Sequence, residues 1–504
     1  MGNGLLMGLD VGTSSCKAMV FDHKGGILGY AYAEYAILCD DTGKMEQDSV
    51  HVLNCLLSCM TQAAAQCDAG RIEAISISVQ GDAAIPVDSE HRPLHNAMLG
   101  MDYRPGRQCD AIRARMDAWK IYEITGQPLH PINFAAKILW FKDNVPDIYE
   151  WACKFVTYAE FVMANLGGRP DIDVTMASRS MAMDIHSGRW SAALLDELGL
   201  DIDKLSDITE CGVDLGKLAP RVAQATGINP GARLIAGGHD QPVGAIGAGA
   251  VSEGMAVDSS GTAEIFSMVY SKPRISRAMH DAYLSTYRHA ARDMYFSFAF
   301  MQAGGILLKW YRDTMGYRDV VEAQQRGMDM YSYIQRDMDD SPSPLFVLPH
   351  FNGSGTPLCD LKSHGAIVGL GLETTRYDIF KALMEGLTYE LRLNIDAAES
   401  AGIAVNEIRA TGGGAKSEVW LRTKANITGR TLTTLKCKEA GCLGAAVIAA
   451  AGTGVYPGLK QAVEGMVKTD RVFAPNQQKT AMYEDRYSLY KQLYYALRDI
   501  NHAL

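Results

Sequence analysis

Residues 5–21 read LLMGLDVGTSSCKAMVF. An apolar run ends in Asp10, a turn of glycine and hydroxyl residues follows, and a second apolar run begins. This pattern predicts two β-strands joined by a tight turn. Residues 27–33 form a third apolar run after another glycine-containing loop. We therefore expect the chain to begin with three consecutive strands, with Asp10 at the end of the first.

The same arrangement recurs halfway along the chain. Residues 256–257 lead into Asp258, the turn SSGTA follows, and residues 265–269 are apolar again. Strand, aspartate, Gly-Thr and strand thus occur twice, which predicts two α/β halves built on one plan. Two unrelated hairpins remain the alternative. The glycine- and alanine-rich stretch at 243–253 is the expected boundary between the halves.

Helices and further strands are predicted between and after these runs. Asp48 can cap a helix with an apolar face, and alternation at 75–79 predicts a strand. The clearest helix spans residues 375–402, and tyrosines recur at helical spacing over 483–494. The same signals predict a strand at 406–410, a helix capped by Ser417, and a tightly packed helix of small residues at 439–451.

Composition and charge limit the classes of protein to consider. The chain has 504 residues, 47% hydrophobic and 21% charged, which indicates two or more globular domains. A net charge of −10 argues against a nucleic-acid partner, because phosphate backbones require a basic face. Nucleotide binding stays open, since backbone amides can hold phosphates. The eleven cysteines lack zinc-site spacing, so we expect reduced thiols.

Targeting signals are not expected. The N-terminal residues MGNGLLMGLD have neither a basic start nor a long apolar core, so we predict no signal peptide. No apolar run is long enough to cross a bilayer, and Leu6 stands where a myristoylation signal needs Ser or Thr. The expected location is the cytoplasm, with no membrane partner.

The turn after Asp10 is suited to binding an anion. Gly12 permits a sharp bend that aims backbone N–H groups and the hydroxyls of Thr13 and Ser14 at one point. Lys17 would add positive charge if its side chain faces that point. Asp10 is placed to hold Mg²⁺, mainly through water. An ordinary hairpin turn is the alternative.

Two further glycine turns extend this interpretation. Residues 259–263 form a second cradle, which would meet the same phosphates from the opposite side if the halves face each other. TGGGAKS at 411–417 joins an expected strand to an expected helix, where adenosine could approach the backbone closely. A dinucleotide-binding turn is disfavoured, because Thr431 and Leu432 lie about twenty positions on, where that turn requires an acid.

One aspartate, Asp240, lies in LIAGGHDQPVGAIGAG at 234–249, between an apolar run and a glycine-rich run. A carboxylate at such a turn suits the acceptance of a hydroxyl proton during phosphoryl transfer, which depends mainly on positioning and electrostatics. His239 is a rival base, but a histidine beside glycines is more often a structural hydrogen-bonding group. We therefore expect Asp240 to be the catalytic base.

Together these residues resemble the FGGY family of carbohydrate kinases, within the larger superfamily of sugar kinases, Hsp70 and actin. The most specific stretch, GAIVGLGLETTRYDIFKALMEGLTYELR at 365–392, closely follows the second signature of that family. The first signature is half present, at 137–144. The resemblance implies an α/β fold of two RNase H-like, actin-like ATPase domains flanking a cleft. We expect a sugar-binding domain at 1–245 and an ATP-binding domain at 246–504, with the last helix packing back on the first domain.

The resemblance also assigns roles residue by residue. Asp10 matches the magnesium position and Asp240 the catalytic base. With Lys17 added for its charge, the residues expected to bind ATP are Gly12, Thr13, Ser14, Lys17, Gly261, Thr262, Gly305, Gly413, Gly414, Ala415 and Ser417. The residues expected to bind the sugar are Gln80, Gly81, Asp82, Asp102, Arg104 and Asp240.

The sugar loop departs from the relatives it resembles. Xylulose kinases tend to have Met and His at positions 81 and 82, and glycerol kinases Arg and Glu. Asp82 could accept hydrogen bonds from two adjacent hydroxyls, with turn capping as the alternative role. Gly100 replaces the Trp of a Trp-x-Asp-x-Arg motif. We expect the small Gly81 and Gly100 to leave a roomier pocket.

The sequence therefore predicts ATP-dependent phosphorylation of a sugar hydroxyl, with ATP and Mg²⁺ as cofactors. A ketose such as xylulose or another pentulose is the first candidate, and a polyol, a hexulose or a sugar acid stays open. An actin- or Hsp70-like ATPase, a catalytically silent sugar sensor and a nucleotide-linked dehydrogenase are the alternatives outside this class. Many relatives form dimers, so a homodimer also stays open.

Overall fold

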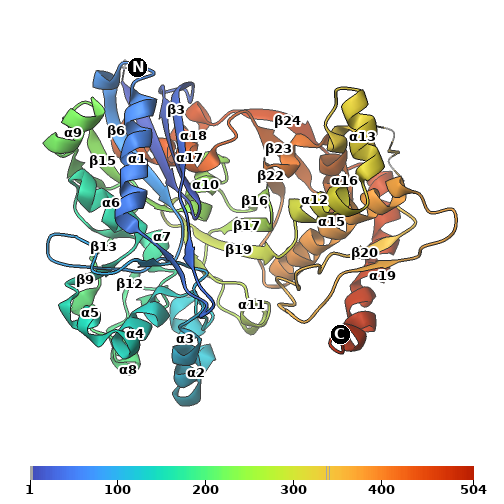
Figure 1. Ribbon diagram of the computed structural model, residues 1–504, viewed down its shortest axis with the longest axis horizontal. Helices are drawn as coiled ribbons and strands as arrows, with labels where there is room; N and C mark the ends of the chain where they lie inside the picture. The colour runs from blue at the N-terminus through green and yellow to red at the C-terminus, as the bar shows by residue number, and fades with distance from the viewer. Residues whose placement is uncertain (1–3, 337, 340) are drawn as a thin grey trace.

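Each half of the chain is built around its own β-sheet, and the two sheets lie in separate lobes (Figure 1). The computed structural model describes residues 4–336, 338–339 and 341–504. The strands of the first sheet, in spatial order, are β14 (Asp214–Lys217), β15 (Arg233–His239), β6 (Ile72–Val79), β1 (Leu5–Val11), β2 (Ser15–Phe21) and β3 (Ile27–Glu34). Those of the second are β18 (Tyr287–Arg288), β19 (Tyr295–Met301), β17 (Glu264–Tyr270), β16 (Met255–Ser260), β22 (Glu407–Gly412), β23 (Thr431–Leu435) and β24 (Thr469–Phe473).

The two sheets share one plan. In the first, β1 pairs antiparallel with β2, β2 pairs antiparallel with β3, and the parallel strands β6 and β15 follow on the other side of β1. In the second, β16, β17 and β19 repeat the antiparallel series, and β22 and β23 repeat the parallel one. The predicted repeat is confirmed, and the α/β fold is the expected pair of RNase H-like domains.

Local sequence signals account for several helix starts. Asp48 accepts hydrogen bonds from the amides of Val50 and His51 at the start of α1 (Ser49–Ala64). Thr375 and Asp378 form a reciprocal capping box at the start of α15 (Arg376–Ser400). Ser417 caps α16 (Glu418–Thr428) through the Trp420 amide. These caps satisfy amides that would otherwise lack partners.

The predicted helix of small residues, α17 (Ala440–Gly452), belongs to the first lobe although its residues come late in the chain. It packs against β1, β6 and β15, and in Figure 1 its red-orange ribbon lies beside the blue strands. It also crosses α10 (Asp240–Gly247) at very short range. A Cβ on Gly444 would lie 1.9 Å from the Val243 carbonyl oxygen, so only glycine fits there. The chain thus returns to the first lobe after building most of the second.

The C-terminal helix α19 (Gln477–Asn501) packs on the second lobe, against α15 and α16. Its buried tyrosines hold it there: the hydroxyl of Tyr483 donates to Glu385 at 2.9 Å, and that of Tyr490 donates to Glu390 at 2.6 Å. The expectation that the last helix packs back on the first domain is therefore wrong. The return is made by α17 and by α18 (Leu459–Met466), because their small and apolar residues fill a face of the first sheet.

Two further expectations concern cysteines and membranes. All eleven cysteines are free thiols, as expected. Among the described residues, no helix combines the length and apolarity that crossing a bilayer requires. The remaining helices that shape the site are α7 (Val174–Ala177), α12 (Gly305–Thr314) and α14 (Met330–Gln335).

Candidate functional site

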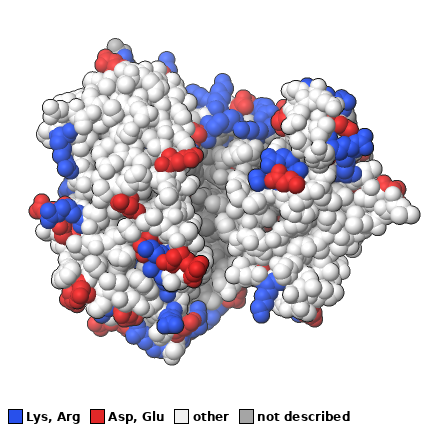
Figure 2. All heavy atoms as spheres, in the orientation of Figure 1, with Lys and Arg blue, Asp and Glu red and all other residues white. Residues whose placement is uncertain are grey.

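A deep hollow separates the two lobes on the face shown in Figure 2. The predicted turns reach this region because each follows the carboxyl end of a central strand: the turn at 12–14 follows β1, and that at 261–262 follows β16. Parallel central strands place such ends at one edge of a sheet, where open α/β sheets commonly bind ligands.

The glycine turns of the second lobe converge on one cavity of ≈ 520 Å³. Five residues predicted from the sequence line it, namely Gly261, Gly305, Gly413, Gly414 and Ser417. Residues that were not predicted complete its walls, namely Ser260, Leu308, Asp329, Tyr331, Ser332, Gln335, Lys416 and Trp420. The cavity is thus concave, partly aromatic and bounded by backbone, as expected for a nucleotide.

Glycine is required at these turns because the backbones lie so close. The Gly305 amide donates to the Gly261 carbonyl at 2.8 Å, and a Cβ on Gly305 would lie 2.8 Å from that oxygen. A Cβ on Gly414 would lie 2.6 Å from Cβ of Ser260 and 2.9 Å from the Trp420 ring. Ala415 and Thr262 were also predicted, but neither lines the cavity. Ala415 is buried behind the turn, and the Thr262 carbonyl accepts from the Ile306 amide.

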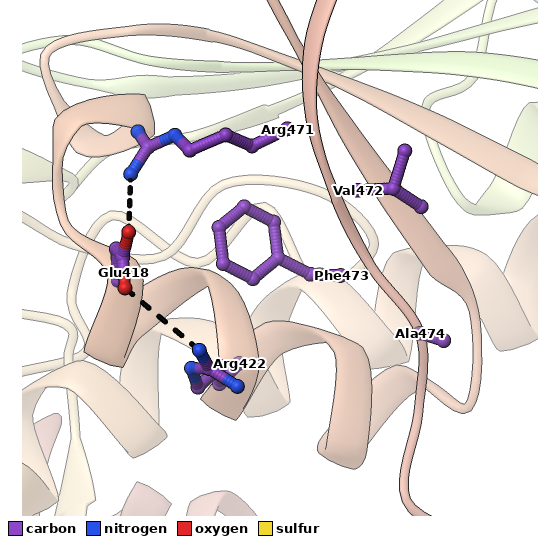
Figure 3. Close-up of a pocket in the computed structure, with 6 residues that line it drawn as sticks. All are labelled: Glu418, Arg422, Arg471, Val472, Phe473 and Ala474. Atoms are coloured by element: carbon purple, nitrogen blue, oxygen red, sulfur yellow. Dashed lines mark hydrogen bonds and ion pairs between the residues drawn. The ribbon is translucent and has the colours of Figure 1, made fainter.

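The back of the 413–418 turn is braced by charged side chains, which line a separate, shallower pocket (Figure 3). Arg471 donates to Glu418 at 2.8 Å and to the Ala415 carbonyl at 3.3 Å. Arg422 approaches the other oxygen of Glu418 at 3.8 Å, and Phe473 lies near both guanidinium groups. This arrangement holds the turn from outside and leaves its inner face to the cavity.

Beneath the second turn lies a buried lysine that the sequence did not reveal. Lys424 Nζ donates to Asp258 at 2.6 Å, Ser260 at 2.7 Å and Glu264 at 2.8 Å. It also lies 4.3 Å from the centroid of the Trp420 ring. Burial raises the pKa of Glu264 to about 8, with the nearby Asp258 charge adding to the effect. Asp258 is therefore part of a buried ion-pair network inside the second lobe.

Asp10, at the corresponding place in the first lobe, has a different environment. Its Oδ1 accepts from Ser78 at 2.7 Å, and no hydrogen bond in the described residues engages its Oδ2. Burial raises the pKa of Asp10, while the Ser78 hydrogen bond opposes that shift. Mg²⁺ is usually held by one or two carboxylates together with phosphate oxygens and water. An available carboxylate oxygen beside a turn with unpaired backbone amides fits such an ion.

The first turn itself presents free backbone groups. The Gly12 amide donates to Ser15, but among the described residues the amides of Thr13 and Ser14 have no hydrogen-bond partner. The turn is held from below by Gln47, which donates to the Thr13 carbonyl and accepts from Gln80 at 2.9 Å. Gln47 therefore links the turn to the predicted sugar loop. The sequence interpretation missed it.

Lys17 is not free to meet an anion. Its Nζ donates to Glu439, just before α17, at 2.5 Å. The ion pair connects β2 to the helix that returns to the first lobe, so the structure gives Lys17 a bracing contact in place of the predicted role at the phosphates. The sequence could not show this pairing, because the two residues lie 422 positions apart.

Asp240 begins α10 directly after β15, with 35% of its side chain exposed. His239 Nε2 lies 3.1 Å from Asp240 Oδ1, and the His239 ring stacks on Phe298 of β19 in the second lobe. Burial raises the pKa of Asp240 to about 7, and the Asp10 charge adds to the shift. Burial holds the pKa of His239 well below its usual range, so His239 is neutral. Asp240 is thus a titratable carboxylate where the lobes meet.

The predicted sugar loop contains a buried ion pair. Asp82 accepts from Arg179, which follows α7. A Cβ on Gly81 would lie 2.4 Å from His239 Nε2 and 3.4 Å from Arg179 Nε, and a Cβ on Gly100 would lie 3.1 Å from the Gly81 carbonyl oxygen. Neighbouring groups already occupy the space that larger side chains would fill, so the expectation of a roomier pocket is wrong.

Asp102 and Arg104 are engaged with each other. Arg104 donates to both Asp102 oxygens and also to Glu46 at 2.7 Å, and Asp102 accepts from the Met45 amide. Asp102 is completely buried. Their side chains brace the loop, and their contact with a sugar stays a prediction.

Comparison with known proteins agrees with this geometry. The model of the N-terminal domain of the FGGY family of carbohydrate kinases matches residues 5–247, and that of the C-terminal domain matches residues 256–453. A xylulose kinase of Bacillus subtilis is 26% identical over 99% of this chain and 98% of its own length. An autoinducer-2 kinase of Klebsiella pneumoniae is 26% identical over 97% and 93%, and a gluconokinase of Bacillus licheniformis is 24% identical over 98% and 96%.

Solved structures support the same fold. A ligand-bound xylulose kinase from Lactobacillus acidophilus matches with a TM-score of 0.88 at 24% identity, covering 98% of each chain. A glycerol kinase of Plasmodium falciparum solved with ADP matches with a TM-score of 0.85 at 22% identity, covering 96% of this chain and 98% of the other. With both domain models matched along most of its length, this chain belongs to the FGGY family of carbohydrate kinases.

Proposed function

We propose that the protein transfers the terminal phosphoryl group of ATP to a hydroxyl of a small sugar, with a ketose such as xylulose or another pentulose as the first candidate. A polyol, a hexulose or a sugar acid is the alternative substrate. The observation that carries the proposal is Asp240, a partly open carboxylate between the lobes with a pKa of about 7. The free thiols favour action in the cytoplasm, a reducing compartment.

The nucleotide is assigned to the cavity of the second lobe. Gly413 and Gly414 let adenosine approach the backbone, and Trp420 and Leu308 supply apolar walls. Ser417 donates to the side-chain oxygen of Gln335, which leaves the amide nitrogen of Gln335 available to a ligand. The glycerol kinase solved with ADP supports the proposal that this chain binds an adenine nucleotide.

The phosphates are assigned to the two glycine turns. The amides of Thr13 and Ser14 on one side, and that of Thr262 on the other, have no hydrogen-bond partner among the described residues and are held in place by the adjoining strands. Oriented amides stabilise developing charge with little reorganisation. Asp10 would hold Mg²⁺, which would offset the negative charge of the phosphates.

Asp240 would accept the proton of the attacking sugar hydroxyl. The sugar oxygen bonds to the terminal phosphorus of ATP while the bond from that phosphorus to ADP breaks. A pKa near neutrality suits this role, because the carboxylate is then available and still basic enough to take a proton. His239 orients Asp240 through their 3.1 Å contact while staying neutral. Closure of the lobes would exclude water, which otherwise competes as an acceptor.

The test is ADP release from ATP and Mg²⁺ with a panel of pentuloses, hexuloses, polyols and aldonates, and mass spectrometry of the product. We expect at least one sugar to stimulate ADP release strongly and to gain one phosphoryl group. ADP release that no sugar stimulates would favour the ATPase alternative. Activity confined to glycerol would reject a ketose substrate.

A further inference from the structure

A buried ion pair lies beside Asp240, at the junction of the two lobes. Arg179 donates to Asp82, and the two residues are only 7% and 3% exposed. Asp82 has a φ of +63°, a conformation that residues other than glycine rarely adopt outside special sites. The Arg179 guanidinium lies 5.3 Å from the ring centroid of Tyr287 and 5.1 Å from that of Phe298. Both rings belong to the second lobe, so the pair is enclosed from both sides.

Polar atoms around this pair lack partners. Among the described residues, Arg179 Nε, His239 Nδ1 and Tyr287 Oη are buried and make no hydrogen bond of good geometry, although the Tyr287 hydroxyl interacts with Arg179. Buried polar groups are nearly always hydrogen-bonded, because an unpaired one costs free energy. The three side chains contact one another, since the His239 ring lies 6.0 Å from that of Tyr287. Such a group of unpaired donors and acceptors beside Asp240 indicates that a ligand supplies the missing partners.

The two arginines near this group are already paired with carboxylates. Arg179 is paired with Asp82, and Arg104 with Asp102 and Glu46. The ammonium group of the buried Lys137 donates to the Ile132 carbonyl. A sugar acid bound here would bring its carboxylate close to Asp82 and Asp240, while the two arginines described above already face carboxylates, and like charges at such range repel.

We infer, on the basis of the proposed kinase function, that Asp82 and Arg179 together select a neutral polyhydroxylated acceptor and discriminate against sugar acids. A hydroxyl can donate to Asp82 while it accepts from Arg179, so vicinal hydroxyls match the alternating groups of the pair. Asp82 has a second effect, because it neutralises the guanidinium that would otherwise attract a carboxylate. Arg179 and Asp82 thus act as specificity-determining residues.

The central test is Asp82→Asn, which leaves Arg179 with its charge and without its carboxylate partner. The measured quantity is the ratio of kcat/KM for an aldonate to kcat/KM for the best neutral sugar. We expect this ratio to be below one in the wild-type protein and to rise by about tenfold or more in the variant, equivalent to ~1.4 kcal/mol. The double variant Asp82→Asn/Arg179→Met should lose that gain, because the free cation is gone.

Two further variants separate specificity from folding. Arg179→Lys keeps the charge but loses the planar fork, so KM for the neutral sugar should rise about tenfold while ADP affinity is unchanged. This variant carries the test if Asp82→Asn does not fold. Asp88→Asn is the matched control, because it removes the carboxylate of an exposed pair with Arg92 and should leave the ratio unchanged.

The outcomes distinguish the two proposals. The inference is overturned if the wild-type protein phosphorylates an aldonate as efficiently as any neutral sugar. It is also overturned if Asp82→Asn keeps the wild-type ratio, or if Arg179→Lys lowers only the melting temperature. If no member of the panel, neutral or acidic, becomes phosphorylated, the proposed kinase function fails and the inference fails with it.

Discussion

Asp10 and Asp258 end corresponding strands of the two sheets, yet only Asp10 has a carboxylate oxygen left for a ligand. Asp258 is buried against Lys424, which reaches it from α16. In the first lobe the lysine opposite Asp10 on the neighbouring strand, Lys17, pairs with Glu439. The repeated motif therefore gives the two lobes the same backbone turn. Whether its aspartate can bind a ligand depends on whether a lysine distant in sequence pairs with it.

The largest expected effect is at Asp240, the carboxylate that completes the first lobe's side of the site. Asp240→Asn removes the proton acceptor and should lower kcat by about 10²- to 10⁴-fold, the range for a lost acid–base group. ADP binding, measured by calorimetry, should persist, because the nucleotide cavity lies in the other lobe. Near-normal turnover would remove Asp240 from the mechanism.

Lys424→Met should destabilise the protein. It leaves Asp258 and Glu264 buried without their cation, and breaking such a buried pair typically costs about 3–5 kcal/mol. Urea denaturation measures the change in the free energy of unfolding. Lys436→Met, at an exposed lysine, is the matched control. If instead the folded variant lost turnover without losing stability, the contrast drawn between the two turns would be wrong.

Asp10→Asn should act on metal use, with little effect on the fold. A carboxylate that holds a metal through its water shell contributes about 10- to 100-fold to metal affinity. We therefore expect the Mg²⁺ concentration for half-maximal activity to rise by about that factor, while the melting temperature stays close to that of the wild-type protein. The matched comparison is Asp258→Asn, where we expect loss of stability to dominate. Equal effects of both variants on Mg²⁺ would contradict the asymmetry.

The smallest expected effect is a shift in pH dependence. Asp240 must be deprotonated to act as a base, so kcat/KM should fall as the pH drops through about 7. Because the Asp10 charge contributes to that raised pKa, Asp10→Asn should move the acidic limb of the profile to lower pH. A series of initial rates from pH 5 to 9 at saturating Mg²⁺ measures the limb; a limb that stays in place would argue against electrostatic coupling of Asp10 to the base.

The features predicted correctly from the sequence are those set by local constraints. Gly261, Gly305, Gly413 and Gly414 all line one cavity, and close approach to neighbouring atoms requires glycine at Gly305 and Gly414; glycine-rich turns of this kind are visible in a short segment. The repeat at β1 and β16 is visible for the same reason. These signals sufficed for the fold and for five of the residues that line the cavity of the second lobe.

The missed features are pairings between distant residues. Arg179 lies 97 positions from Asp82, and Lys424 lies 166 positions from Asp258. No local sequence pattern identifies the partner of either cation, because these ion pairs form only when distant segments of the chain fold together. For that reason the sugar side, where Asp82, Asp102 and Arg104 all pair within the protein, was the least well predicted.

The position of α17 also bears on how the protein is made. One face of the first sheet is covered by this helix, so it stays bare while the roughly 190 residues between Gly247 and Ala440 are being synthesised. At about 5–20 residues per second, that interval lasts on the order of 10 to 40 s. The amino-terminal lobe therefore cannot mature on the ribosome ahead of the rest, and nascent chains that stall within this interval are expected to become clients of chaperones.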